Sequence, residues 1–330
     1  MIAPRCLLIA MALLLASCTG QQSALDVHGT SAIQLKHLVI GIVAVCSLVW
    51  MLVMVVMILA LVRRRDDRLD LAPSNDRRLV TAVIGATVAT IFIITGFTMA
   101  SFHTTRALNA PGGDLTILVR GQQWWWDVTY LDPDSSRSFK TANEIRIPVG
   151  KSVRLQLEAG DVIHSFWVPS LAGKLDLIPG RKNELTIRAE HAGIYRGQCA
   201  EFCGMQHTHM AVFVVAEEGD AFETWARSQR ASSMPPDDAD ARAGQSVFLA
   251  KPCAACHTVR GTAATGTTGP DLTHVGSRLT IAAGLSDNTR GAVAAWIADP
   301  QTLKPGNNMP MVSLGSDELK QLSAYMVSLK

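Results

Sequence analysis

The hydrophobic positions of the first hundred residues form three runs, and the first of these runs is short. It covers residues 6–16, follows Arg5, and ends at the small residues Ser17 and Cys18. A basic start, a brief apolar stretch and small residues after it are typical of an export signal rather than of a membrane span. We therefore expect residues 1–17 to be a signal peptide.

The residues around the predicted cleavage point indicate a modification. Residues 15–18 read Leu-Ala-Ser-Cys and resemble the bacterial lipobox, in which the cysteine thiol is alkylated by diacylglycerol and becomes the mature N-terminus. This resemblance implies lipidation of Cys18, and the alternative is an ordinary signal peptide beside an incidental cysteine. In both cases the polar residues 18–37 form an exported N-terminal segment.

The two longer apolar runs are long enough to cross a membrane. Residues 38–62 and 79–102 hold no Asp, Glu, Lys or Arg, and as helices rising ~1.5 Å per residue both exceed a hydrocarbon core of ~30 Å. The loop between them, residues 63–78, contains six arginines and four aspartates. Short arginine-rich loops remain on the cytoplasmic side. Both ends of this transmembrane hairpin are therefore expected to face outward, with everything after Phe102 exported.

After Phe102 the pattern changes to short β-rich runs separated by Gly, Pro and Asn, which predicts an all-β sandwich or barrel at residues 111–220. The expected strands are 115–119, 124–130, 144–148, 152–157, 183–188 and 210–215. A helix over 220–230 and a polar, proline-containing stretch come next. Residues 221–240 are therefore predicted to be a helix and a flexible linker.

The C-terminal region, residues 241–330, has a third pattern. Helical segments are expected over 241–249, 290–298 and 317–329, between loops rich in Gly, Thr and Pro. The pattern predicts a small all-α domain. The chain as a whole is thus predicted to be a multidomain membrane protein with a two-helix transmembrane hairpin, an all-β domain and an all-α domain.

Composition narrows the possible function classes. Apolar residues make up 48% of the chain, which excludes a disordered protein. Thirty Lys and Arg against 28 Asp and Glu leave no basic excess for binding phosphates, so we expect no nucleic-acid partner. Seven cysteines are too few for a disulfide scaffold in a chain of this length, and their spacings indicate separate chemistries.

The strongest local motif is Cys253-Ala-Ala-Cys256-His257, because C-x-x-C-H is the attachment sequence of c-type haem. The thiols of Cys253 and Cys256 would bond to the haem, and His257 would bind its iron. No second C-x-x-C exists to complete a zinc ribbon. Met309, on a proline-flanked loop, is the expected distal ligand, and Met311 is the alternative.

A second cluster of soft ligands follows the pattern Cys199-x3-Cys203-x3-His207-x2-Met210, with His164 earlier in the chain. Thiolate, thioether and imidazole ligands select copper, and one cysteine more than a blue-copper site needs allows two thiolates to bridge two copper ions. A Cys199–Cys203 disulfide is the structural alternative. His209 competes with His207 for the ligand role.

Longer motifs resemble subunit II of cytochrome c oxidase. They are Gly121-Gln-Gln-Trp124-Trp-Trp126, Asp161-Val-Ile-His164-Ser-Phe-Trp-Val-Pro-Ser170, Asp176-Leu-Ile-Pro-Gly-Arg181 and the Cys199 to Met210 pattern. With its C-terminal haem motif the chain is similar to the caa-type branch, in which a cytochrome c is fused to that subunit. The resemblance implies a cupredoxin-like β domain and a class I cytochrome c domain.

The resemblance also implies the ligands of a dinuclear copper A centre, which are His164, Cys199, Glu201, Cys203, His207 and Met210. Glu201 would bind copper through its backbone carbonyl, and its side chain would bind a magnesium ion shared with subunit I; an exposed loop acid is the alternative. Trp124 matches the aromatic residue that first receives electrons, whereas Trp125 and Trp126 are expected to serve packing. The family's glutamate at the start of the second span has no counterpart in residues 76–83.

We therefore interpret the chain as the electron-input subunit of a respiratory haem-copper oxidase in the bacterial cytoplasmic membrane, with both soluble domains on the periplasmic face. Electrons would pass from haem c to copper A and then to subunit I, which reduces oxygen to water. The expected partners are subunit I, subunit III, membrane lipid, and an external cytochrome or a quinol-oxidising complex as electron donor.

Two other functions share parts of this pattern. The electron-input subunit of a copper A nitric oxide reductase could use the same copper module. A membrane-anchored copper or haem delivery protein would need one exchangeable site, whereas two closed sites favour permanent residence of the cofactors. The sequence shows no obvious acid, base or nucleophile constellation, which suits a role that depends on the placement of cofactors.

Overall fold

The computed structural model describes residues 20, 22–63, 76–108, 113 and 115–330. The predicted signal peptide, Cys18 and most of the predicted cytoplasmic loop lie outside these residues. Contacts divide the chain into two compact units. One is residues 33–110, and the other is residues 1–32 together with residues 111–330. Each unit is described separately below.

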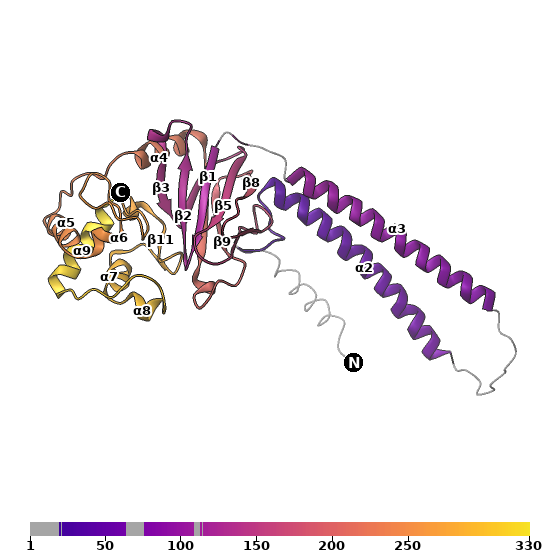
Figure 1. The fold of residues 1–330 in the computed structure, drawn as a ribbon. Coiled ribbons are helices and arrows are strands. Elements are labelled where there is room, and N and C mark those ends of the chain that lie inside the picture. Colours follow the sequence, from indigo (N-terminus) through magenta and orange to yellow (C-terminus); the bar gives the residue numbers. More distant parts are fainter. Residues whose placement is uncertain (1–19, 21, 64–75, 109–112, 114) are drawn as a thin grey trace, which may run out of the picture. The chain divides into compact units, whose positions relative to one another are not determined.

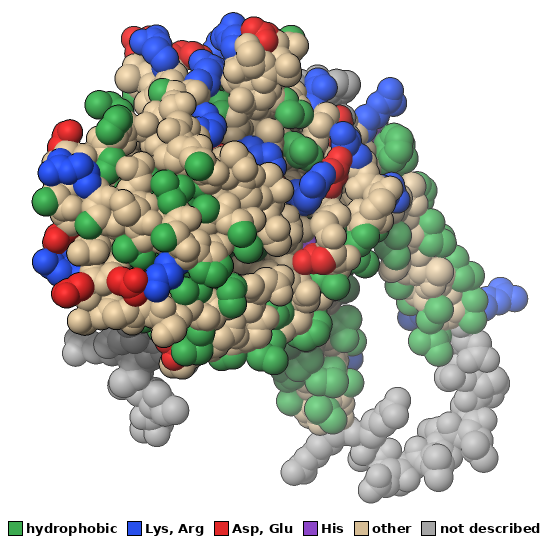
Figure 2. All heavy atoms as spheres, turned by 60° about the vertical axis from the view of Figure 1, so that its left-hand side comes forward, with side chains coloured by type: hydrophobic (Ala, Val, Ile, Leu, Met, Phe, Trp, Pro, Cys, Tyr) green, Lys and Arg blue, Asp and Glu red, His purple; other side chains and the backbone are tan. Residues whose placement is uncertain are grey.

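The first unit is a pair of long helices, α2 (Thr30–Val62) and α3 (Asp76–Leu108), which Figure 1 shows side by side. Both pass the length and hydropathy test for a membrane span, with mean hydropathies of 3.0 and 2.2. Most of their side chains are exposed and apolar, and hydrophobic atoms cover them almost continuously in Figure 2. Helix α2 begins before its predicted apolar run and ends with it at Val62. Helix α3 extends beyond its predicted run at both ends.

The β domain consists of two five-stranded sheets, ordered β3-β2-β1-β5-β8 and β4-β10-β9-β6-β7 (Figure 1). Its strands are β1 (Leu115–Gln122), β2 (Trp125–Leu131), β3 (Phe139–Ala142), β4 (Glu144–Pro148), β5 (Val153–Ala159), β6 (His164–Trp167), β7 (Leu175–Leu177), β8 (Asn183–Ile187), β9 (Gly193–Cys199) and β10 (Ala211–Glu217). The six predicted strands are all present. The sheets confirm the cupredoxin-like fold class.

The core of this domain lies between the two sheets. In β1, β2 and β5 buried residues alternate with less buried ones, because successive side chains of a strand point to opposite faces. Trp126 and Phe166 are fully buried, and their rings meet edge to face with centroids 5.6 Å apart. The packing role predicted for Trp126 is consistent with this position. Helix α4 (Gly219–Arg230) follows the last strand, close to the predicted helix.

The C-terminal domain is formed by helices α5 (Ala239–Ala250), α6 (Cys253–Cys256), α7 (Arg290–Ala298), α8 (Pro300–Leu303) and α9 (Ser316–Ser328), with a two-stranded pair of β11 (Thr280–Ile281) and β12 (Ser286–Asp287). Helices α5 and α9 cross closely, since a Cβ atom at Gly244 would lie 2.0 Å from the carbonyl oxygen of Gln321. Phe248 and Tyr325 pack at this crossing with ring centroids 5.8 Å apart.

The segment between the β domain and the C-terminal domain, which its composition predicts to be a free tether, makes several hydrogen bonds to the C-terminal domain. The guanidinium of Arg260 donates to the carbonyl oxygens of Gln229 and Arg230 at 2.6 and 3.2 Å. The backbone N–H of Ser233 donates to the carbonyl of Arg260 at 3.0 Å, and His274 Nε2 lies 3.1 Å from the carbonyl of Ala231. These contacts hold residues 229–233 against the C-terminal domain, so the first part of the linker is attached to that domain.

Candidate copper and haem sites

The candidate copper site lies at the ends of two neighbouring strands. His164 begins β6 and Cys199 ends β9, and these strands pair antiparallel with Phe166 opposite Cys199. The loop that follows Cys199 returns directly into β10. Its two ends are joined by a hydrogen bond of 2.9 Å from the Cys199 N–H to the Met210 carbonyl, followed by the β9–β10 ladder.

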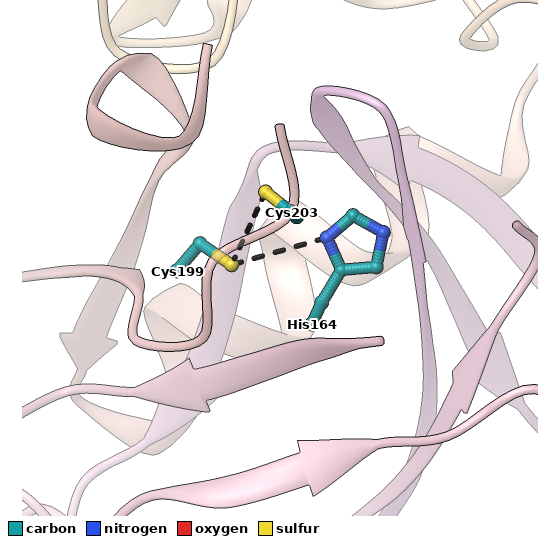
Figure 3. Close-up of side chains that lie close together, drawn as sticks. All are labelled: His164, Cys199 and Cys203. Carbon is teal, nitrogen blue, oxygen red and sulfur yellow. Dashed lines mark hydrogen bonds between the residues drawn. The ribbon is translucent and has the colours of Figure 1, made fainter. Parts of the chain in front are cut away.

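The six residues predicted to bind copper come together at this point, and Figure 3 shows the side chains of His164, Cys199 and Cys203. The distances are 3.8 Å from Cys199 Sγ to His164 Nδ1, 3.2 Å from Cys199 Sγ to the Glu201 carbonyl oxygen, 3.7 Å from Cys203 Sγ to His207 Nδ1, and 4.0 Å from Cys203 Sγ to Met210 Sδ. The sequence alternative His209 instead places Nδ1 2.8 Å from Gln206 Oε1, which favours His207 as the ligand.

The two cysteines remain free thiols, so the disulfide alternative is not formed. Their sulfur atoms lie 3.7 Å apart, whereas a disulfide bond is about 2.05 Å long. The hydrogen bond with Cys203, together with that from His164, lowers the pKa of Cys199 well below its usual range, while the hydrogen bond with Cys199 and burial raise the pKa of Cys203. The two thiols therefore titrate as a coupled pair that readily carries one negative charge.

The surrounding residues hold these donors in place. His164 Nε2 lies 2.8 Å from Asp161 Oδ1, which leaves Nδ1 directed at Cys199. Burial opposes protonation of His164, but its hydrogen bonds with Cys199 and Asp161 raise its pKa overall. The His164 ring rests on Gly121, where a Cβ atom would lie 2.8 Å from it. Metal-binding histidines are commonly oriented by such a carboxylate on the other ring nitrogen.

Trp124 lies directly beside the copper loop. Its side chain is 8% exposed, and its indole Nε1 donates to the Cys203 carbonyl at 3.0 Å. The Gln123 amide donates to the same oxygen at 2.7 Å. The two contacts hold the backbone of one predicted ligand, Cys203, in place.

The candidate haem site is built around α6, which begins at Cys253 and ends at Cys256. Both thiols are free. The Nδ1 atom of the following His257 lies 2.8 Å from the Pro270 carbonyl oxygen, so its Nε2 is left for a metal. Burial lowers the pKa of His257, which favours the neutral imidazole that metal binding requires.

The predicted distal loop is held by its own hydrogen bonds. Met309 N–H donates to Asn307 Oδ1 at 2.7 Å, and the Met309 carbonyl accepts from Gln301 Nε2 at 2.9 Å. Met311, the alternative ligand, is 61% exposed and lies outside this network. The residues therefore fit a c-type haem with Met309 as its second ligand better than one with Met311.

The structure adds residues that sequence reasoning did not single out. Asp161 and Gly121 lie within motifs that carry the family resemblance, but their contacts with His164 were not predicted. Gly269 packs against the His257 ring, where a Cβ atom would lie 2.6 Å away. A glycine that leaves room for an imidazole ring is not marked by any particular spacing from the histidine. Its contact with His257 could therefore not be read from the sequence.

Comparisons with known proteins identify two families in the chain. Residues 115–217 match the family described as cytochrome c oxidase subunit II, periplasmic domain, and residues 241–330 match cytochrome c. Cytochrome c oxidase subunit 2 of Alkalihalophilus pseudofirmus is 33% identical over 97% of this chain and 95% of its own length. The subunit 2 of Bacillus subtilis is 32% identical over 66% of this chain and 62% of its own.

A solved structure is also similar to part of the chain. It is the periplasmic domain of subunit II of cytochrome oxidase from Bradyrhizobium japonicum, 35% identical over 36% of this chain and 96% of that one, with a TM-score of 0.34. The similarity to the Alkalihalophilus protein extends through the helical hairpin and both of the domains that follow it. The chain therefore belongs to the cytochrome c oxidase subunit 2 family, as a member with a C-terminal cytochrome c domain.

Proposed function

We propose that this subunit is the electron input of its oxidase, taking electrons at haem c and passing them through copper A to subunit I. The observation that carries the proposal is the direct contact between the two candidate sites' loops. Gln206 Nε2, in the copper loop, donates to the Pro305 carbonyl oxygen at 2.8 Å, in the loop that leads to Met309. Both redox sites therefore border one domain contact within one compact unit.

The subunit II and cytochrome c families imply copper and haem c, and the proposal assigns their ligands in this chain. Copper supplies one-electron chemistry when bound, and the dinuclear centre would be held by His164, Cys199, Cys203, His207, Met210 and the Glu201 carbonyl. The thiolate character of Cys199 and the burial of both sulfur atoms suit a soft metal. The chain's own contribution is to orient His164 and to exclude water from the thiols.

On the haem side, Cys253 and Cys256 would form the covalent bonds, and His257 and Met309 would bind the iron. A His/Met pair raises the haem potential, which suits electron transfer. The Pro270 carbonyl fixes the orientation of the His257 ring, and Gln301 with Asn307 fixes the loop of Met309.

Trp124 is the residue proposed to receive electrons between the two sites. It bonds to the Cys203 carbonyl on one side, and on the other it approaches the haem domain, where a Cβ atom at Gly306 would lie 3.7 Å from its ring. A π-system that touches both domains supports this role. Its backbone carbonyl also takes part in the contact between the domains.

The proposal also covers the location of the protein in the cell and its partners in the oxidase. As a subunit II the protein belongs to the membrane and works with subunit I of an oxidase. We further propose the periplasmic orientation of both exported domains, lipidation of Cys18, subunit III as a partner, and a magnesium ion at Glu201, whose side chain is half-buried. The relatives above are named as oxidase subunits, which favours this function over a nitric oxide reductase or a delivery protein.

The test is flash photoreduction of the haem in the purified complex, with absorbance followed at haem c, at copper A and in subunit I. We expect haem oxidation to coincide with copper reduction, and electrons to appear in subunit I afterwards. In the Cys199→Ser, Cys203→Ser double variant the haem should stay reduced. Electrons that reach subunit I equally fast without copper would contradict the proposed path.

A further inference from the structure

A lysine from the haem domain is buried against the copper domain. Lys304 follows α8 and is 2% exposed. Its Nζ atom donates to three backbone carbonyl oxygens, those of His209 at 2.7 Å, Trp124 at 2.8 Å and Ala282 at 3.0 Å. Two of these acceptors belong to the copper domain and one to the haem domain. An ammonium group has three N–H donors, so the three carbonyls satisfy it completely.

Burying the ammonium group of Lys304 costs free energy unless each of its N–H donors has an acceptor. A buried ammonium loses its hydration, and the burial lowers the pKa of Lys304 to about 7. Among the described residues, no carboxylate lies within ion-pair distance of it. A lysine on the surface of a single domain would remain in water, so its position is explained by the contact between the domains.

Other hydrogen bonds also join the two domains. The Ala211 N–H donates to the Ala283 carbonyl at 2.9 Å, and the Leu279 N–H donates to Glu144 Oε2 at 2.8 Å. Ala282 and Ala283 both have left-handed backbone, with φ of 54° and 61°, which L-residues seldom adopt. Their carbonyls are the ones bound by Lys304 and Ala211, so the contact holds this unusual backbone in place.

We propose that Lys304 is a positioning residue that locks the haem domain onto the copper domain and thereby fixes the geometry of haem-to-copper electron transfer. The inference rests on the proposed function. It assigns the docking to one buried cation that bonds on one side to Trp124 and to the copper loop at His209, and on the other to its own domain at Ala282. The exposed charges of the two domains would then contribute little to docking.

The variant that tests this is Lys304→Met, which keeps the length of the side chain and removes its donors. The matched control is Lys251→Met, because Lys251 pairs with Glu318 at 2.9 Å inside the haem domain, away from the copper loop. In the complete oxidase we expect the internal haem-to-copper rate of Lys304→Met to fall on the order of tenfold, as small displacements of reacting groups do. The Lys251→Met rate should be unchanged.

The second readout is the dependence of this internal rate on salt. In the parent protein the rate should be nearly independent of ionic strength, whereas in Lys304→Met docking would depend on exposed charges and the rate should fall as salt rises. The visible spectra and midpoint potentials of both cofactors should stay as in the parent. A positioning residue is expected to change the rate alone.

Two results would overturn the proposal. One is an internal rate and salt dependence in Lys304→Met equal to those of the parent. The other is loss of haem or copper absorbance in both Lys304→Met and the milder Lys304→Gln, since the lysine would then serve folding rather than positioning. Failure of the proposed function itself would look different, because the parent protein would then pass no electrons from haem to copper.

Discussion

The carboxylate of Asp161 holds the imidazole of His164, with 2.8 Å between Oδ1 and Nε2. The same side chain accepts hydrogen bonds from the backbone N–H groups of Gln123 and Val162, both at 2.6 Å. One acid thus connects the loop before β6 to the segment that carries Trp124. The relationship makes Asp161 a support for the copper ligand without being a ligand itself.

The first prediction concerns this support. Asp161→Ala should leave the domain folded but lower its copper affinity by roughly 10- to 100-fold, because the ring of His164 loses its orienting partner. Titration of the apoprotein with copper against a competing chelator measures the effect. Glu184→Ala is the control, since Glu184 is exposed on β8 and bonds only weakly, to Gln156 at 3.4 Å. Equal affinity in the two variants would contradict the role of Asp161.

The second prediction concerns the thiols. The Cys199→Ser, Cys203→Ser double variant should lose its copper while haem stays covalently attached, because the haem domain has a core of its own. Metal analysis and a haem stain on a denaturing gel measure both quantities in one preparation. Cys46→Ser, at an exposed position of α2, should change neither. Unchanged copper content in the double variant would show that the ligands lie elsewhere.

The third prediction separates the two candidate methionines. Met309→Leu should open the distal side of the haem, so that added carbon monoxide binds readily to the reduced protein. Met311→Leu should not, because the Met311 side chain is 61% exposed. Absorbance spectra with and without carbon monoxide decide between them, and the opposite pattern would transfer the ligand role to Met311.

The fourth prediction uses the contact beneath the proximal histidine. In Gly269→Ala the new methyl group would lie 2.6 Å from the His257 ring, so the ring must shift away from the Pro270 carbonyl. Because the imidazole becomes less basic when this hydrogen bond is lost, we expect a higher midpoint potential and a weakened iron–histidine bond, visible in redox titration and in resonance Raman spectra. Gly291→Ala is the matched control, because a Cβ atom there meets no atom within 4 Å. Identical spectra in both variants would be incompatible with this packing.

The fifth prediction concerns the N-terminus, which lies outside the described residues. The mature chain should begin at Cys18 and carry an acyl mass, and Cys18→Ala should remove that mass without releasing the protein from the membrane. Two spanning helices already anchor it, and a lipid adds little to that. Mass spectrometry of the mature protein provides the measurement, and an unmodified Cys18 would exclude lipidation.

The sequence predicted the strands whose hydrophobic alternation is regular, such as β1 and β5, but it missed β3, β6, β7 and β9. Strand β3 has only four residues. Strand β9 contains Gly193 and Gly197, which weaken any strand pattern. Gly197 is nevertheless required, because a Cβ atom there would lie 2.5 Å from the Trp167 carbonyl oxygen. Strands β6 and β7 span only four and three residues, too few to show a period.

The candidate ligands were predictable because soft donors at fixed spacing are rare outside metal sites. The contact between the domains was not. Lys304-Pro-Gly306 looks like an exposed turn in the sequence, and the acceptors of Lys304 are backbone carbonyls, which every residue possesses. Composition likewise suggested a free linker, whereas the guanidinium of Arg260 holds it.

The loop between β9 and β10, which carries most of the proposed copper ligands, is ordered by the sheet around it. Its ends are joined by the Cys199 to Met210 hydrogen bond and the strand ladder beyond, and these rest on a core that includes Trp126 and Phe166. Ordering of this loop therefore belongs to the folding of the sheets, unlike in small metal domains that fold only around their ion. We therefore expect that the proposed copper could be removed and restored without refolding of the domain.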